Sequence, residues 1–174
     1  EVFSVVAPMF EASWTVEKDK YLPESATFDN EGNLYFSPLL NDEGLTLIAI
    51  SAETGERQWG IKGVGIGGGA PIILDRPNHP GKQVIYHCNY EHAWAIHPSG
   101  EILWKADSRL DIENIPKDRA RDSHCWGMNY VPQFDALTAV TGDGHVTVYD
   151  RRTGEFLLEE PYLLPGGPTP PSDN

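Results

Sequence analysis

Short runs of apolar and β-branched residues, separated by turn residues, extend along most of the chain. Residues 25–63 read as SATF, NLYFSPLL, LTLIAIS and ERQWGIKG, joined by the turns DNEG, NDEG and AETG. Apolar runs of this length between clusters of Gly, Asn and Asp are typical of strands joined by hairpins. The pattern therefore predicts a four-stranded antiparallel sheet in this region.

The third of these runs has apolar residues on both of its faces. In LTLIAI (residues 45–50), one side of a strand would carry two leucines and an alanine, and the other a threonine and two isoleucines. An antiparallel sheet with one face in water would show a cleaner alternation of apolar and polar residues. The sequence thus favours sheets that are stacked face to face.

The same order of strands and turns recurs twice further along the chain. Residues 69–107 contain GAPIIL, QVIYHCN, AWAIH and EILWKAD, with a long turn, DRPNHPGK, after the first run. Residues 128–160 contain MNYVPQF, LTAVT, HVTVYD and EFLLEE. Trp14, Trp59 and Trp104 are 45 residues apart at each step, and Leu158 takes the equivalent place 54 residues later. A repeat of four strands with a period near 45 residues is typical of propeller blades.

We therefore predict an all-β fold, a partial β-propeller of about three four-stranded antiparallel blades plus one strand of a preceding blade. The predicted parts are an outer strand of the preceding blade (1–17), three blades (24–63, 69–107 and 124–160), an inserted loop (108–123) and a Pro/Gly-rich tail (161–174). Because propellers contain about four to eight blades, we expect the sequence to be a fragment whose partners include the remaining blades.

Three segments resemble the repeat A-x-D-x-x-T-G-x-x-x-W of the pyrroloquinoline-quinone (PQQ)-like β-propeller family. AISAETGERQW (residues 49–59) matches this repeat with Ser51 in place of the aspartate. AIHPSGEILW (residues 95–104) keeps Ala, Gly and Trp in a turn one residue shorter, and VYDRRTGEFLL (residues 148–158) keeps Asp, Thr and Gly but ends on Leu. The resemblance implies that Trp59 and Trp104 dock between neighbouring blades, and it implies a periplasmic or extracellular location.

Charge and composition narrow the possible partners. The chain has 26 acidic and 13 basic residues, a formal net charge of −13, which repels nucleic-acid phosphates at long range. No apolar run approaches the roughly 20 residues of a membrane-spanning helix. We therefore expect neither nucleic acid as a partner nor a membrane span.

One motif has the spacing of a dinucleotide-binding turn and one group of residues is of metal-binding types, but the surrounding sequence favours neither kind of site. GVGIGG (residues 63–68) has the glycine spacing of dinucleotide-binding turns, but a strand pattern with a proline follows instead of a helix, so we interpret it as a connection between blades. His87, Cys88, His92 and His97 are residue types that bind zinc or copper. Strand alternation sends His87 and Cys88 to opposite faces, which favours ordinary strand and turn residues.

Cysteine pairing and two further segments stay open at this stage. Cys88 and Cys125 could form a disulfide across adjacent blades in an oxidising compartment, but their spacing does not establish it. DSRLDIENIPKDRARDS (residues 107–123) could be a recognition loop, although a solvated connection is favoured. The segment after it places His124, Trp126, Asn129 and Tyr130 at the start of an innermost strand, as a ligand site or, preferably, as packing residues.

The sequence lacks a nucleophile elbow, a zinc helix, an EF-hand loop and a haem attachment motif. We expect no catalytic, cofactor-binding or metal residues, and we predict a non-catalytic binding or scaffolding module that takes a protein or small-molecule ligand on a loop face. The alternative is a fragment of a PQQ-dependent alcohol or sugar dehydrogenase. For that alternative the resemblance implies PQQ, Ca²⁺ and adjacent cysteines, whereas Cys88 and Cys125 are not adjacent.

Overall fold

The described part of the chain consists of three four-stranded antiparallel sheets. The computed structural model describes residues 22–40, 43–63, 69–89, 91–108, 125–141 and 144–165. The first sheet contains β1 (Leu22–Phe28), β2 (Leu34–Leu40), β3 (Leu45–Ile50) and β4 (Arg57–Lys62). The second contains β5 (Ile72–Arg76), β6 (His79–Cys88), β7 (His92–Ile96) and β8 (Ile102–Asp107). The third contains β9 (Cys125–Val131), β10 (Ala136–Thr141), β11 (His145–Asp150) and β12 (Tyr162–Leu163), with a short 3₁₀ turn, η1 (Pro132–Phe134), after β9.

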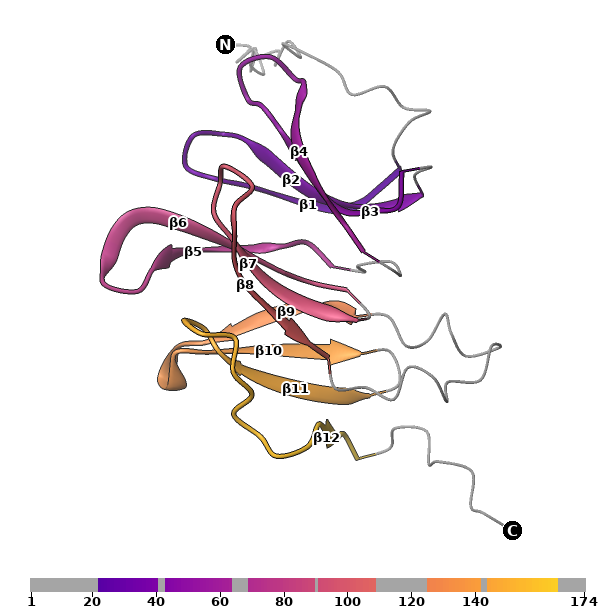
Figure 1. The fold of residues 1–174 in the computed structure, drawn as a ribbon, viewed down its shortest axis with the longest axis vertical. Coiled ribbons are helices and arrows are strands. Elements are labelled where there is room, and N and C mark those ends of the chain that lie inside the picture. Colours follow the sequence, from indigo (N-terminus) through magenta and orange to yellow (C-terminus); the bar gives the residue numbers. More distant parts are fainter. Residues whose placement is uncertain are drawn as a thin grey trace, which may run out of the picture.

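The strands of each sheet lie side by side in chain order, and Figure 1 shows the three sheets stacked face to face. This arrangement confirms the predicted all-β fold with three blades of a β-propeller. Among the described residues, no helix has the length and apolar character that crossing a bilayer requires.

Two details of the strand prediction are wrong. The long turn predicted over residues 75–82 is a two-residue turn between Arg76 and His79, because Asn78 adopts a left-handed φ of 62° that a tight hairpin requires. The strand predicted over residues 155–160 is reduced to one bridge between Tyr149 and Phe156.

The edge of the third sheet is formed further along the chain. Val146 faces Tyr162 and Tyr149 faces Phe156. Two residues of β11 therefore lie between these pairs, whereas the outer segment has five, so the outer segment must loop outward. Pro161 lies in that loop and lacks the N–H that a ladder needs.

Several predicted segments lie outside the described residues. They are residues 1–17 with Trp14, the glycines at 64–68, most of the inserted loop together with His124, and the tail beyond residue 165. The predictions for these segments therefore stay predictions.

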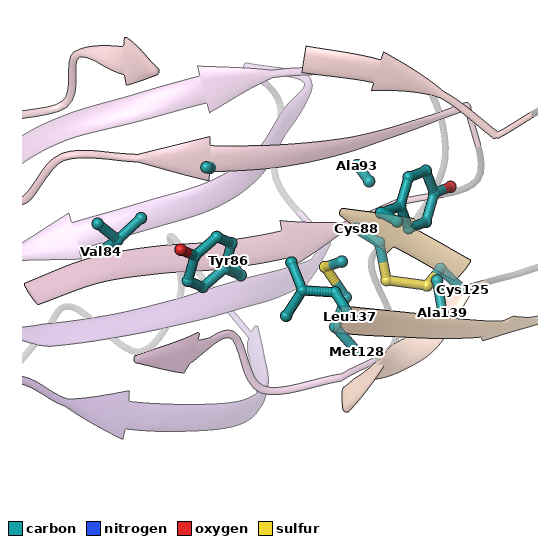
Figure 2. Close-up of a cluster of buried hydrophobic side chains, with 10 residues drawn as sticks. Val84, Tyr86, Cys88, Ala93, Cys125, Met128, Leu137 and Ala139 are labelled. Atoms are coloured by element: carbon teal, nitrogen blue, oxygen red, sulfur yellow. A yellow bond between two sulfur atoms is a disulfide. The ribbon is translucent and has the colours of Figure 1, made fainter. Parts of the chain in front are cut away.

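Apolar residues fill both spaces between neighbouring sheets. All six residues of β3 are buried, which explains why both faces of this strand are apolar. On one face, Leu47 and Ala49 pack with Ile85, Trp94 and Ile96 of the second sheet. The seam between the second and third sheets contains a cluster around Tyr86, Leu137 and Tyr149, part of which is shown in Figure 2. Burial of apolar surface at these seams holds the sheets together.

Each seam is also closed by an indole ring that lies against a glycine of the next sheet. The indole N–H of Trp59, on β4, donates to the carbonyl of Pro98 at 2.8 Å, and a Cβ on Gly100 would stand 2.8 Å from the indole. The indole N–H of Trp104, on β8, donates to the carbonyl of Arg151 at 3.1 Å, and a Cβ on Gly154 would stand 2.6 Å from the ring. The docking role implied for both tryptophans is confirmed.

The turns that carry Gly154 and Gly55 are each shaped by the side chain at the start of the turn. In the turn before Gly154, the Asp150 carboxylate accepts the backbone N–H groups of Arg152 and Thr153 at 2.8 and 2.9 Å. In the first sheet, the Ser51 hydroxyl takes the same place and accepts from residues 53 and 54 at 3.2 and 3.3 Å. A hydroxyl can therefore replace the carboxylate of the repeat because both are acceptors at the start of the turn.

A disulfide joins the second and third sheets. Cys88, at the end of β6, is bonded to Cys125, at the start of β9, with Cα atoms 6.0 Å apart and a sequence separation of 37 residues. Figure 2 shows the bond beside Ala93 and Ala139 within the buried cluster. The pairing that sequence spacing left open is therefore formed, and it links two adjacent blades.

A buried histidine lies at the seam between the first and second sheets. His87 is 2 % exposed, stacks on Trp94 with ring centroids 5.7 Å apart, and its Nε2 lies 3.3 Å from the Thr46 hydroxyl. Burial lowers the pKa of His87 to about 4, and a hydrogen bond with Thr46 offsets this only in part. His87 is therefore neutral in the folded chain at pH 7.

We predict that Gly154→Ala lowers the free energy of unfolding by about 3 kcal/mol, because the new Cβ adds a clash with Trp104 to the strain of a left-handed φ of 75°. Gly81→Ala is the matched control, since Gly81 also has a positive φ, 80°, but nothing lies within 4 Å of its Cβ position. The control should lower the free energy of unfolding, measured by urea unfolding, by about 1 kcal/mol. Equal losses in the two variants would contradict the docking contact.

We predict that Cys88→Ser combined with Cys125→Ser lowers the free energy of unfolding by up to about 4 kcal/mol, because the bond closes a loop of 37 residues in the unfolded chain. Urea unfolding of the natural chain should shift in the same direction when dithiothreitol is added. The double variant should not respond to dithiothreitol. A natural chain whose unfolding is unaffected by the reductant would show that the bond is absent or contributes nothing.

We predict that folding stability falls as the pH is lowered from about 6.5 to about 4, because the unfolded chain then binds a proton at His87 that the folded chain excludes. The contribution of His87 should approach about 3 kcal/mol at the acid end. His87→Gln should flatten this part of the stability curve, measured by urea unfolding at a series of pH values. The exposed His97→Gln is the control and should retain the dependence of stability on pH over this range, whereas equal slopes for both variants would count against the buried histidine.

Candidate functional site

The turns of the three blades define one face of the stack. The turns between the first and second strands (residues 29–33, 77–78 and 132–135) and those between the third and fourth strands (residues 51–56, 97–101 and 151–155) lie on the left of Figure 1. The second group carries Gly55, Gly100 and Gly154. We call this side of the molecule the glycine-turn face.

An open cavity of about 330 Å³ lies on the glycine-turn face at the seam between the second and third sheets. Its walls include Arg76 and His79 from the β5–β6 hairpin, Tyr86 and Trp104 from the second sheet, and Arg151 and Arg152 from the turn after β11. Its volume lies at the lower end of the range for small-molecule sites. We call it the arginine cavity.

Arg151 connects the two sheets beneath this cavity. The residue is 8 % exposed, and its Nη1 donates to the backbone carbonyl of Asp75 in β5 at 2.8 Å. Its Nη2 forms an ion pair with Asp135 at 2.6 Å, and its guanidinium lies 4.9 Å from the centre of the Tyr130 ring. Its Nε is buried without a hydrogen-bond partner among the described residues. These contacts hold the Arg151 side chain in one position.

Asp135 organises the cationic side chains around the cavity. It has a left-handed φ of 48° and accepts a hydrogen bond from the Tyr130 hydroxyl at 2.9 Å. It also pairs with Arg152 at 3.2 Å as well as with Arg151. Burial alone would raise the pKa of Asp135, but the Tyr130 hydrogen bond and the two arginines outweigh it, so the pKa lies below its usual value. Asp135 is therefore charged and shared by the two arginines.

The lining of the cavity is cationic although the chain as a whole is acidic. Three arginines line it, no described Asp or Glu side chain does, and the chain carries a formal charge of −13. Asp135 neutralises part of this charge from outside the lining, while Arg76 is exposed and has no ion-pair partner among the described residues. Guanidinium groups in such a concave site are suited to planar anions.

The glycine-turn face also exposes two phenylalanines. Phe28, at the end of β1, is 62 % exposed, and Phe134, at the end of η1, is 78 % exposed. Phe28 directly precedes the turn at residues 29–33 and Phe134 lies in the turn at residues 132–135, so both lie on the same side of the stack as the arginine cavity. This face therefore combines exposed aromatic side chains with a cationic hollow.

The structure does not bring the predicted metal-type residues together. Cys88 is in the disulfide and His87 is buried against Thr46, whereas His92 pairs with Asp107 at 3.2 Å and His97 lies 2.8 Å from the Ser99 hydroxyl. Within the described ranges, no group of three or more His, Cys, Asp or Glu side chains is placed to hold a metal ion.

The second predicted set is also dispersed. His124 lies outside the described residues, Trp126 is 55 % exposed at the start of β9, and Asn129 is exposed. Only Tyr130 lies close to the arginine cavity, through its contacts with Arg151 and Asp135.

The arginines of the cavity were missed in the sequence. A difference between the repeats could have indicated this site. The two residues after Asp150 are arginines, whereas Ala and Glu follow Ser51, and Pro and Ser follow His97. The departure of one repeat from the others could have directed attention to this turn. The contact with the β5–β6 hairpin could not be read from the chain, since Arg151 and Asp75 are 76 residues apart.

Comparisons with known proteins bear on the fold. No protein-family model matches the sequence, and no curated protein matches it. Among solved structures, the chain is similar to BamB from Moraxella catarrhalis, with a TM-score of 0.54 and 14 % identity over 84 % of this chain and 39 % of that one. It is also similar to Sqt1 from Saccharomyces cerevisiae, with a TM-score of 0.59 and 16 % identity over 82 % of this chain and 39 % of that one.

A europium-containing methanol dehydrogenase is a third similar structure, with a TM-score of 0.50 and 16 % identity over 78 % of this chain and 31 % of that one. The chain thus spans between about a third and two fifths of the length of these three proteins. At such low identity the likeness shows the fold alone. The described residues form part of a β-propeller fold.

Proposed function

We propose that the chain is a non-catalytic β-propeller repeat domain that acts as a binding or scaffolding module and uses its glycine-turn face to bind. The observation that carries this proposal is the arginine cavity, an open hollow lined by three arginines and built by two sheets that are otherwise closely packed. Binding sites are commonly concave and placed on turns held by a rigid scaffold.

The side chains around the cavity are of the types that contribute most to protein interfaces. Arginine and aromatic residues are enriched in such interfaces and supply much of their binding energy. Phe134 and Phe28 are the most exposed of the large apolar side chains in the described part of the chain, and Arg76 and Arg152 lie on the same face. We infer that a partner protein contacts this face.

The disulfide supports a location in an oxidising compartment. Bonds such as Cys88–Cys125 persist in the periplasm or outside the cell and are uncommon in the cytosol. A periplasmic or extracellular location is therefore part of the proposal, and the formal charge of −13 argues against nucleic acid as the partner.

A second candidate is a fragment of a PQQ-dependent dehydrogenase that would use PQQ and Ca²⁺. The fold likeness to the europium-containing methanol dehydrogenase is the observation in its favour. Cys88 and Cys125 are bonded across two blades and are not adjacent in sequence, so they do not supply the adjacent cysteines that the family resemblance implies.

Site-specific photocrosslinking tests the proposal. A photoreactive residue in place of Phe28 or Phe134 should capture the same partner protein in cells that produce the full chain, because both positions are exposed on the glycine-turn face. The same residue in place of Lys62, exposed at the far end of β4, is the control and should not capture it. Equal capture at all three positions, or dye-linked alcohol oxidation by the full chain after PQQ and Ca²⁺ are added, would contradict the binding module.

A further inference from the structure

We propose that the arginine cavity binds a small monocarboxylate, with the carboxylate near Arg76 and Arg152 and an apolar body against Leu103 and Trp104. The inference goes beyond the proposed function, since it concerns a small ligand and not the partner protein. It combines the charge, the lining and the volume of one cavity.

The charge of the cavity selects an anion. Arg152 has a side chain that is 58 % exposed, and among the described residues it forms an ion pair only with Asp135, which it shares with Arg151. Arg76 is exposed on the opposite wall and has no ion-pair partner among the described residues. These two guanidiniums can therefore turn donors toward a ligand, and their fork geometry matches the two oxygens of a carboxylate.

Arg151 acts as a positioning residue. Its contacts with the Asp75 carbonyl, Asp135 and Tyr130 fix it between the sheets, so it adds a permanent positive charge near the ligand without having to reorganise. The cavity is thus preorganised for negative charge.

The remaining lining is mixed: Pro77, Asn78 and His79 belong to the β5–β6 hairpin, and Leu103 and Trp104 are the apolar side chains that are not fully buried. Val84, Tyr86 and Ala95 of the second sheet lie behind them and are at most 2 % exposed. A volume of about 330 Å³ leaves room for a ring or a short aliphatic chain beside the carboxylate. The ligand class is therefore a carboxylate with an apolar body and not a bare inorganic anion.

The charge of the whole chain favours a monoanion over a dianion. A formal charge of −13 repels an approaching ligand in proportion to the charge that it carries. Asp135 also cancels one of the three arginine charges around the cavity. We therefore expect a carboxylate, which carries one negative charge, to bind in this cavity more tightly than a phosphate ester, which carries up to two.

The corresponding seam between the first and second sheets has a different chemistry. There the turn contains Pro98 and Ser99 in place of the two arginines, and the neighbouring hairpin is linked to the second sheet by a hydrogen bond from the Asn30 N–H to the Gln83 side chain at 2.7 Å. The cationic lining is therefore a property of one seam and not of the repeat as such.

Calorimetric titration and NMR shifts test the assignment with 3-phenylpropionate as the probe. We expect it to bind the full chain, 3-phenylpropionamide to bind at least tenfold more weakly, and inorganic phosphate to show no saturable binding. Arg76→Gln and Arg152→Gln should each weaken the binding of 3-phenylpropionate by roughly tenfold, because each variant loses a charged hydrogen bond. Arg57→Gln, an exposed arginine on β4 that pairs with Glu43, is the control and should bind like the natural chain.

Three outcomes would overturn the inference. They are equal binding of the acid and the amide, phosphate binding as tight as that of the acid, and unchanged affinity in both Arg76→Gln and Arg152→Gln. Far-ultraviolet circular dichroism of each variant shows whether the sheets are retained, and loss of binding counts in favour only where they are. Crosslinking at Phe28 and Phe134 is read separately, so failure of the partner proposal and failure of the carboxylate site are distinguishable.

Discussion

The packing of an indole ring against the backbone of the next blade is the interaction on which the structure depends. Trp59 and Trp104 each cover a turn glycine and donate to a carbonyl of that turn, so each contact specifies both how close two sheets come and how they are aligned. Only glycine allows this approach, because a Cβ would overlap the ring. Apolar burial supplies most of the attraction between the sheets, whereas the indole contact makes the alignment specific.

This constraint also creates the candidate binding site. The carbonyl of Arg151 receives the indole N–H of Trp104, while the side chain of Arg151 reaches back to the Asp75 carbonyl in the second sheet. One turn residue therefore closes the seam with its backbone and contributes charge to the cavity with its guanidinium. The cavity exists because the arginine turn and the β5–β6 hairpin are held at the distance that the indole contact allows. Binding at this place is expected to be coupled to the docking of two blades.

Much of the fold could be predicted from the chain, because the repeat places an indole, a turn glycine and apolar strands at regular intervals. The docking of Trp59 and Trp104 followed from the family resemblance and the recurring turns. Features that depend on how two blades align could not be predicted, because they are formed by contacts between residues that are distant in sequence. The Cys88–Cys125 bond and the contact between Arg151 and Asp75 are of this kind. Local backbone choices were also missed, such as the tight turn at Asn78 and the outward loop before β12.

Hydrogen exchange of the indole N–H groups, followed by NMR on ¹⁵N-labelled protein, tests the central claim most directly. Trp59 and Trp104 donate to backbone carbonyls within the seams, whereas Trp126 is 55 % exposed. The account predicts that the indole protons of Trp59 and Trp104 exchange much more slowly than that of Trp126. Exchange of all three at similar rates would show that the indole rings do not hold the blades together.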